Sequence, residues 1–179
     1  LKKKMDLKKY IRSIPDYPKK GILFRDITTL IKDKDAFKEC IDQMSKILMK
    51  LNFDKIASIE SRGFVFASAL CYNLSKSLIL MRKKDKLPAE KYSQEFELEY
   101  GKATLEIHKD SIKPKENILI IDDLIATGGT SEAGAKLVEK SGGIVSGFMF
   151  VINLFDLGGK KFLEKKGYKA FSLIDFPGH

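Results

Sequence analysis

The stretch ILIIDDLIATGGT, residues 118–130, decides the fold. Its first four residues are apolar without alternation, which is typical of a strand buried on both faces of a sheet. Two carboxylates, Asp122 and Asp123, follow this strand, and a Thr-Gly-Gly-Thr loop comes after them. A helix then opens at Ser131 and Glu132. The stretch therefore predicts a buried strand that leads through an acidic pair and a glycine-rich loop into a helix.

The glycine-rich loop predicts a phosphate site. Glycines let a backbone close around a ligand at little steric cost, and free N–H groups at a helix N-terminus favour an anion. The acidic pair would repel a phosphate, so it suits hydroxyl groups or a hydrated cation beside the phosphate. Adjacent carboxylates at the end of a buried strand are costly unless they are used. We therefore expect a ligand with a terminal phosphate and nearby sugar hydroxyls.

Two upstream strands end in basic loops. Residues 55–59 (KIASI) precede the loop Glu60-Ser61-Arg62-Gly63 and a buried helix, and residues 77–81 (SLILM) end in Arg82-Lys83-Lys84. Ligands of parallel sheets bind outside the carboxyl ends of the strands, so we expect these loops to meet the glycine-rich loop at one crevice. Taken alone, the first loop fits equally well a surface turn with a salt-bridged arginine.

The N-terminal third predicts helix, irregular chain and helix again. Residues 6–13 favour a short helix, and Pro15 and Pro18 favour an irregular segment around Phe24-Arg25-Asp26. A helix capped by Asp33 or Asp35 should follow. Its core stripe recurs at helical spacing and comprises Phe37, Ile41, Met44, Leu48 and Leu51.

The helix–strand rhythm breaks between residues 84 and 107. Two alternating segments flank Tyr100-Gly101, which predicts an antiparallel hairpin inserted at the crevice and able to move as a lid. The hairpin carries several carboxylates, and the pattern alone does not choose among them: Glu95, Glu97, Glu99 and Glu106.

The remaining chain completes an α/β arrangement. Residues 142–154 predict a long strand, residues 157–167 a short helix and residues 168–176 a final strand. Short helical crossovers imply a mostly parallel, twisted sheet with helices on both faces. We expect one domain over residues 1–179.

Composition narrows the class of protein. The net charge is +9, but most lysines alternate with acids on expected helix surfaces, so we expect no nucleic-acid partner. The sequence has no apolar run near the ~20 residues of a membrane span and no secretory signal at residues 1–13. Cys40 and Cys71 lie far apart, as in a reduced cytoplasmic protein. No Cys/His metal pattern is present.

Five separate motifs resemble those of the type I phosphoribosyltransferases, and among them the enzymes that act on adenine. They are IPDYPKKGILFRDIT (14–28), ESRGF (60–64), RKKDKLP (82–88), LEYGKATLEI (98–107) and IDDLIATGGT (121–130). The resemblance spans about residues 14–175 and implies the type I fold, with a hood over about residues 12–33 and a lid over about residues 84–107. It implies purine salvage, in which adenine and 5-phospho-α-D-ribose 1-diphosphate give AMP and diphosphate, with Mg²⁺, in a cytoplasmic homodimer.

The resemblance also implies roles for particular residues. The 5′-phosphate is held by the loop residues Ala126, Thr127, Gly128, Gly129 and Thr130. Asp122 and Asp123 contact the ribose hydroxyls. The substrate itself supplies most of the ligands of the Mg²⁺, which the two aspartates contact through water. The diphosphate is held by Ser61, Arg62, Arg82 and Lys86. The purine is held by the hood residues Leu23, Phe24 and Arg25, partly through backbone contacts.

The assignment of the acid–base residue depends on an aspartate that related enzymes have and this chain lacks. Hypoxanthine-guanine enzymes carry an aspartate at the position of Ala126 and tend to have lysine at that of Gly129. Without that aspartate, the resemblance assigns proton transfer to Glu99, and it assigns ordering of the closed lid to Tyr100. Three alternatives remain at this point: a transferase of another purine such as xanthine or guanine, a ligand-sensing regulator of the same fold, and an inactive nucleotide-binding subunit.

Overall fold

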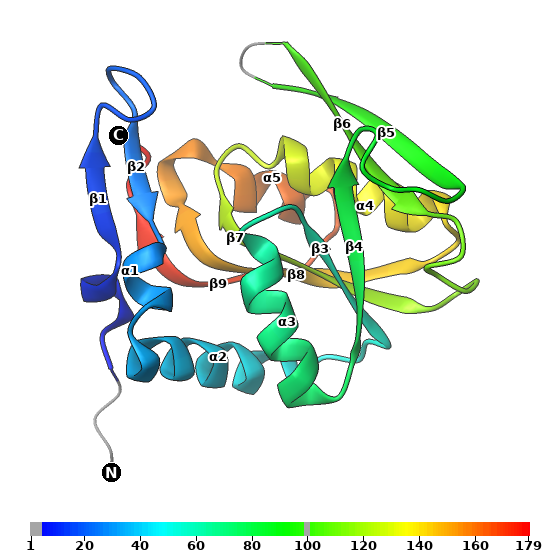
Figure 1. The fold of residues 1–179 in the computed structure, drawn as a ribbon, viewed down its shortest axis with the longest axis horizontal. Coiled ribbons are helices and arrows are strands. Elements are labelled where there is room, and N and C mark those ends of the chain that lie inside the picture. The colour runs from blue at the N-terminus through cyan, green and yellow to red at the C-terminus, as the bar shows by residue number, and fades with distance from the viewer. Residues whose placement is uncertain (1–4, 99–100) are drawn as a thin grey trace.

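The central sheet is mostly parallel (Figure 1). The computed structural model describes residues 5–98 and 101–179, and in that part seven strands form one sheet. Their order across the sheet is β5 (Lys91–Glu97), β6 (Lys102–His108), β4 (Ser77–Lys83), β3 (Lys55–Ile59), β7 (Asn117–Ile125), β8 (Ile144–Leu154) and β9 (Ala170–Phe176). The strands from β4 to β9 in this order are parallel, and β5 and β6 are antiparallel.

Helices cover both faces of this sheet, as the sequence predicts. Leu119 and Ile121 of β7 pack in one core with the helices α2 (Lys34–Leu48) and α3 (Gly63–Leu74). Ile118 and Ile120 pack in a second core with α4 (Gly129–Lys140) and α5 (Gly159–Lys165). All four side chains are fully buried, and each such burial stabilises the fold by about 1.5–3 kcal/mol. Burial on both faces explains why the apolar run does not alternate.

The N-terminal prediction was wrong in two places. The helix expected over residues 6–13 is a single 3₁₀ turn, η1 (Leu7–Tyr10). The segment expected to be irregular contains two paired strands, β1 (Arg12–Pro15) and β2 (Leu23–Asp26), in antiparallel register. Pro15 is the last residue of β1, a position that proline tolerates because the missing N–H interrupts no further pairing. A short helix, α1 (Thr28–Ile31), follows this hairpin.

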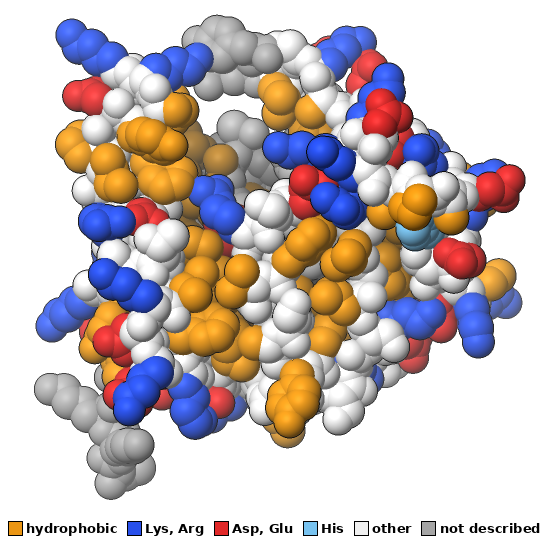
Figure 2. Space-filling model, in the orientation of Figure 1, with side chains coloured by type: hydrophobic (Ala, Val, Ile, Leu, Met, Phe, Trp, Pro, Cys, Tyr) orange, Lys and Arg blue, Asp and Glu red, His pale blue; other side chains and the backbone are white. Residues whose placement is uncertain are grey.

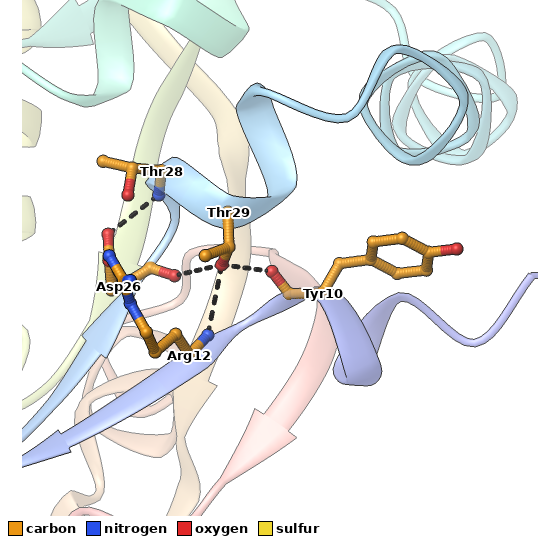
Figure 3. A network of polar contacts seen from close by, with 5 residues as sticks. All are labelled: Tyr10, Arg12, Asp26, Thr28 and Thr29. Atoms are coloured by element: carbon orange, nitrogen blue, oxygen red, sulfur yellow. Dashed lines mark hydrogen bonds and ion pairs between the residues drawn. The ribbon is translucent and has the colours of Figure 1, made fainter.

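A polar network closes the base of the N-terminal hairpin (Figure 3). Arg12 Nε and Nη2 lie 3.0 and 2.5 Å from Asp26 Oδ2. The Thr29 hydroxyl donates to the carbonyl of Tyr10 at 2.6 Å, and the Thr28 N–H donates to Asp26 Oδ1 at 2.9 Å. Burial alone would raise the pKa of Asp26, but the hydrogen bonds from Thr28 and Arg12 and the Arg12 charge lower it overall.

Asp26→Asn should make the protein less stable and less sensitive to acid. Because the folded-state pKa of Asp26 is lowered, its contribution is present above its unfolded pKa of about 3.9 and is lost as the pH falls through the folded value. We expect a loss of about 1–2 kcal/mol in the free energy of unfolding at neutral pH, at the lower end because Arg12 is half exposed. Urea titrations from neutral pH into acid should show a shallower decline than wild type, whereas the exposed Asp35→Asn should follow wild type. Parallel curves for wild type and Asp26→Asn would contradict the assignment.

Several element ends differ from the prediction. Asp33 caps α2 as expected, and its carboxylate accepts from the N–H groups of residues 35 and 36. Strand β7 runs through Ile125, so both aspartates lie within it, and β4 includes Arg82 and Lys83. Helix α4 begins at Gly129, two residues early. In the core stripe, Ile41, Met44 and Leu48 are buried, while Phe37 and Leu51 are only partly buried.

The inserted hairpin is confirmed as β5 and β6, which pair antiparallel from Lys91↔His108 to Glu97↔Lys102. It joins the sheet at its base through Arg82↔Glu106 and Lys83↔Leu105. Figure 1 shows the β1–β2 and β5–β6 hairpins at opposite sides of the sheet, with the loop after β7 between them. Glu99 and Tyr100 lie outside the described residues. None of the helices formed by residues 5–98 and 101–179 has the length and apolar composition of a membrane span.

Candidate active site

A cavity of about 210 Å³ lies at the end of β7. Its lining is one continuous stretch, residues 122–131, together with Arg62 from the start of α3. The cavity therefore contains the acidic pair, the glycine-rich loop and the first residues of α4, as the sequence analysis expects.

The glycine-rich loop has the geometry of an anion site. Gly128 precedes α4 with φ of +94°, a left-handed conformation that side chains disfavour. In the described chain, no side chain caps the N-terminus of α4. The first-turn N–H groups of a helix have no partner within the helix, so those of Gly129, Thr130 and Ser131 are available to the cavity.

The acidic pair is electrostatically strained. Burial, followed by the neighbouring Asp123 carboxylate, raises the pKa of Asp122 well above its ordinary value. Asp122 Oδ1 accepts from the N–H of Asp123 at 2.8 Å. The buried Asp123 forms an ion pair with Arg62, with Nε and Oδ2 2.8 Å apart. Asp122 thus takes up a proton more readily than an isolated aspartate would.

Close packing places α3 against the acidic pair. A Cβ atom on Gly63 would lie 2.8 Å from both Asp122 Oδ1 and Ser58 Oγ, so any larger residue at the first position of the helix would displace these side chains. Ser58 is fully buried and donates to the carbonyl of Ile121 at 2.9 Å. Gly63 therefore allows close approach of α3 to the strands that carry Ser58 and Asp122.

The N-terminal hairpin reaches the same place through Phe24. The Arg62 guanidinium lies 5.3 Å from the centre of the Phe24 ring, and Tyr17 packs edge-on against that ring at 5.2 Å. Phe24, Arg62, Asp123 and the cavity are therefore neighbours, although they come from three distant parts of the chain.

The second basic loop is held beside Ser61. Arg82 Nε lies 3.1 Å from Glu60 Oε1, and the N–H of Lys83 donates to the same oxygen at 2.7 Å. Burial would raise the pKa of Glu60, but these two donors lower it. The Glu60–Ser61 peptide bond is cis. Arg62 and Arg82 are thus both in ion pairs, as the alternative interpretation allows for Arg62, and of the two Arg62 lines the cavity.

Of the expected residues that the structure describes, six do not line this cavity: Ser61, Arg82, Lys86, Leu23, Phe24 and Arg25. Arg25 is buried, donates to Ser13 Oγ and to the carbonyl of Pro177, and lies 4.4 Å from the centre of the Phe176 ring. Any role of Arg25 in binding a ligand must therefore use its backbone. Lys86 is exposed, four residues beyond Arg82.

The hairpin carboxylates differ in their surroundings. Glu106 is buried and accepts from the N–H of Asp85 at 3.0 Å and from Ser93 Oγ at 3.2 Å. Glu95 pairs with Lys102 at 2.7 Å. The carbonyl oxygen of Glu97 lies 3.6 Å from the position of a Cβ on Gly129. The chain that continues from Glu97 toward residue 99 therefore leaves from beside the glycine-rich loop.

Sequence reasoning missed the contribution of α5. The N–H of Gly159 donates to the carbonyl of Ala126 at 3.0 Å, and Phe162 packs beside Gly128. The paired glycines at residues 158 and 159 were the available signal, since glycine at a helix start often marks close approach of another backbone.

Comparison with known proteins identifies the class. Residues 27–176 match the sequence profile of the phosphoribosyl transferase domain. Because this match covers most of the chain, the protein belongs to the phosphoribosyltransferase family.

Its relatives narrow the family to one group. The adenine phosphoribosyltransferase of Pelagibacter ubique is 67% identical over 175 residues, which cover 98% of this chain and 100% of the relative. That of Prosthecochloris aestuarii is 51% identical and covers 97% of this chain and 99% of the relative.

Solved structures agree with this assignment. The adenine phosphoribosyltransferase of Thermoanaerobacter pseudethanolicus is 50% identical with a TM-score of 0.91, and the match covers 95% of this chain and 98% of that one. The Saccharomyces cerevisiae enzyme, solved with an imino-altritol bisphosphate and adenine, is 33% identical with a TM-score of 0.87, over 94% and 96% of the two chains. The resemblance stated from the sequence, including the adenine group, is confirmed.

Proposed function

We propose that the protein is an adenine phosphoribosyltransferase of purine salvage, which converts adenine and 5-phospho-α-D-ribose 1-diphosphate into AMP and diphosphate. The observation that carries the proposal is the cavity lined by Arg62 and residues 122–131. In it the uncapped N-terminus of α4 lies beside two carboxylates, an arrangement that suits a sugar phosphate. The identity of 67% to a relative of that name supports the choice of base.

The phosphoribosyl group fits the two halves of the cavity. In our proposal the backbone N–H groups and hydroxyls of residues 126–130 bind the 5′-phosphate, and Asp122 and Asp123 accept from the ribose hydroxyls. The uncapped start of α4 supports the first assignment. The position of both carboxyl groups in the lining of the same cavity supports the second, because carboxylate oxygens accept hydrogen bonds from hydroxyl groups.

The basic loops suit the diphosphate. Ser61 and Arg62 lie at the start of α3, and Arg82 lies on the neighbouring strand β4. Glu60 holds Arg82 in place, and Asp123 holds Arg62 at the cavity. We propose that these residues, with the exposed Lys86, bind the diphosphate and stabilise the charge that develops on it as it leaves.

The acidic pair fits a magnesium ion that the substrate carries. Carboxylate oxygens are ligands that Mg²⁺ accepts, often through water. In the described part of the chain, no three His, Cys, Asp or Glu side chains come together as a metal site. The protein would thus contribute Asp122 and Asp123, and the sugar diphosphate would supply the other ligands of the ion. When bound, Mg²⁺ would add positive charge that makes diphosphate a better leaving group.

The remaining proposed roles concern the binding of adenine and the transfer of its proton. We propose that Phe24 packs on the adenine ring while backbone groups of Leu23 and Arg25 form hydrogen bonds with the edge of that ring. The position of Phe24 next to Arg62 supports this proposal. The bond from C1′ to the diphosphate oxygen breaks, adenine N9 bonds to C1′ from the opposite face, and Glu99 accepts the N7 proton. The hairpin carrying Glu99 and Tyr100 would close over the site and exclude the water that could hydrolyse the reactive sugar.

A base panel tests the proposed function directly. With 5-phospho-α-D-ribose 1-diphosphate and Mg²⁺, we expect adenine to be converted to AMP, and hypoxanthine, guanine and xanthine to react at least ~10²-fold more slowly. Chromatography would follow nucleotide and diphosphate together, and omission of either the sugar diphosphate or Mg²⁺ should remove the product. Faster conversion of another base would overturn the proposal.

A homodimer is part of the proposal. Apolar side chains gather over α3 and β4 on the face shown in Figure 2. In these two elements Tyr72 is 91% exposed, and Val65 and Leu80 are each 40% exposed. A second copy of this chain covering these side chains would remove them from water. Sedimentation should give twice the chain mass of 20.3 kDa, and Tyr72→Asp should shift it toward one chain. A wild-type species of single-chain mass at micromolar concentration would contradict the dimer.

We also propose a cytoplasmic location. Cys40 and Cys71 are free and buried, and burial raises the pKa of Cys40 to about 12 and that of Cys71 to about 11. Unpaired thiols are usual in reducing compartments. Cell fractionation with an antibody against the chain would check the location, and recovery outside the cytoplasmic fraction would refute it.

A further inference from the structure

Helix α5 packs directly against the glycine-rich loop. The N–H of Gly159 donates to the carbonyl of Ala126 at 3.0 Å. A Cβ on Gly159 would lie 2.8 Å from Gly128 N and 2.8 Å from Ile125 Cγ1, and it would also press on the Ala126 carbonyl oxygen. Real Cβ atoms essentially never come within 3.0 Å of other heavy atoms. Gly159 does not have a left-handed φ, so it is this approach, and not its conformation, that requires glycine.

Gly128, in the loop, also lies close to α5. A Cβ on Gly128 would lie 2.9 Å from Phe162 Cδ1 and 3.1 Å from the carbonyl oxygen of Gly159. Two glycines and one aromatic ring therefore fix the distance between the loop and the helix. Glu132, in the first turn of α4, also pairs with Lys166 at 2.8 Å, which ties the end of α5 to the start of α4.

We propose that Gly159 and Phe162 are positioning residues, which hold the glycine-rich loop in the shape that binds the 5′-phosphate. The inference rests on the proposed function of that loop. Neither residue lines the cavity, so neither can touch the ligand there. They fix the direction in which the loop N–H groups point toward the phosphate. This direction matters because hydrogen bonds weaken steeply when the donor is misaligned. A side chain on Gly159 displaces the Ala126–Gly128 backbone, and loss of the Phe162 ring removes the contact that supports Gly128.

The test compares Gly159→Ala with Gly167→Ala. Gly167 ends the same helix with φ of +89° and has no atom within 4 Å of a Cβ position, so its replacement strains α5 without touching the loop. Calorimetric titration with ribose 5-phosphate should show affinity reduced roughly 10- to 100-fold in Gly159→Ala, the effect of losing about one hydrogen bond to a charged group. Gly167→Ala should bind like wild type, even with a lowered melting temperature.

Kinetics give a second readout that general instability would not produce. In Gly159→Ala, the KM for 5-phospho-α-D-ribose 1-diphosphate should rise by the same factor as the loss of affinity, while the KM for adenine stays within about twofold. Equal ribose 5-phosphate affinity in Gly159→Ala and Gly167→Ala would overturn the inference. If wild type itself fails to bind ribose 5-phosphate, the proposed function of the loop fails instead, so the two failures are distinct.

Phe162 keeps the inference testable if Gly159→Ala does not fold. Phe162→Ala should weaken ribose 5-phosphate binding several-fold, and Phe162→Leu, which restores apolar bulk against Gly128, should recover most of the affinity. Wild-type affinity in Phe162→Ala would contradict a positioning role for the ring.

Discussion

Gly128→Val should abolish binding of both 5-phospho-α-D-ribose 1-diphosphate and AMP. Gly128 has φ of +94° immediately before α4, and a β-branched residue is a genuine outlier in that conformation. The new side chain would also meet Phe162 Cδ1 at 2.9 Å and the Gly159 carbonyl oxygen at 3.1 Å from its Cβ alone. The loop must therefore change its path, and the N–H groups proposed to bind the 5′-phosphate no longer converge.

Titration calorimetry would measure this loss, with Gly167→Val as the matched control. Gly167 has a similar φ of +89° but open space around it, so its valine variant carries the backbone strain without the collision at the loop. We expect no detectable heat from either ligand with Gly128→Val and clear binding with Gly167→Val. A titration of Gly128→Val that matches wild type would refute the assignment of the phosphate site.

Glu99→Ala should lower turnover by roughly 10²- to 10⁴-fold, the usual contribution of a positioned proton transfer. Binding of 5-phospho-α-D-ribose 1-diphosphate should change little, because the proposed role concerns adenine N7 only. The surroundings of the other hairpin carboxylates support this choice. Glu106 is buried among its own hydrogen-bond donors, and Glu95 is paired with Lys102. The hairpin chain passes the glycine-rich loop at Glu97, two residues before Glu99.

Glu95→Ala is the control for this experiment. It removes a carboxylate of the same hairpin whose ion pair with Lys102 is exposed, so turnover should stay within about threefold of wild type. Rapid-quench measurement of a single turnover would separate the chemical step from release of products. A near-normal chemical step in Glu99→Ala would remove Glu99 from the acid–base role.

Much of the sheet was predictable because its strands carry a local signal. The run at residues 118–121 has no polar residue, and its four side chains pack alternately into the two cores. The N-terminal hairpin lacked such a signal. Strand β1 ends in a proline, and its pairing with β2 depends on contacts such as Arg12 with Asp26, which no short stretch of sequence reveals.

The candidate site also contains parts that the sequence predicts and parts that it does not. The loop and acidic pair are contiguous, so sequence alone could place them together, and the order of the strands brought Arg62 beside them. The sequence could not show that Asp123 pairs with Arg62, or that Arg25 points toward the C-terminal residues. It also could not show that α5 supports the loop, because Gly159 and Ala126 are far apart in the chain and meet only when the sheet is folded.

The hydrogen bond from Arg25 to the Pro177 carbonyl also bears on the order in which the protein matures. It joins residues 152 positions apart, and the Phe176 ring, 4.4 Å from the guanidinium, is almost as distant in the sequence. Contacts between such distant positions require a long loop of chain to close. During synthesis, the N-terminal hairpin emerges from the ribosome long before its partner exists. The side that we propose to receive adenine can therefore reach its final packing only after residues 176 and 177 have been synthesised.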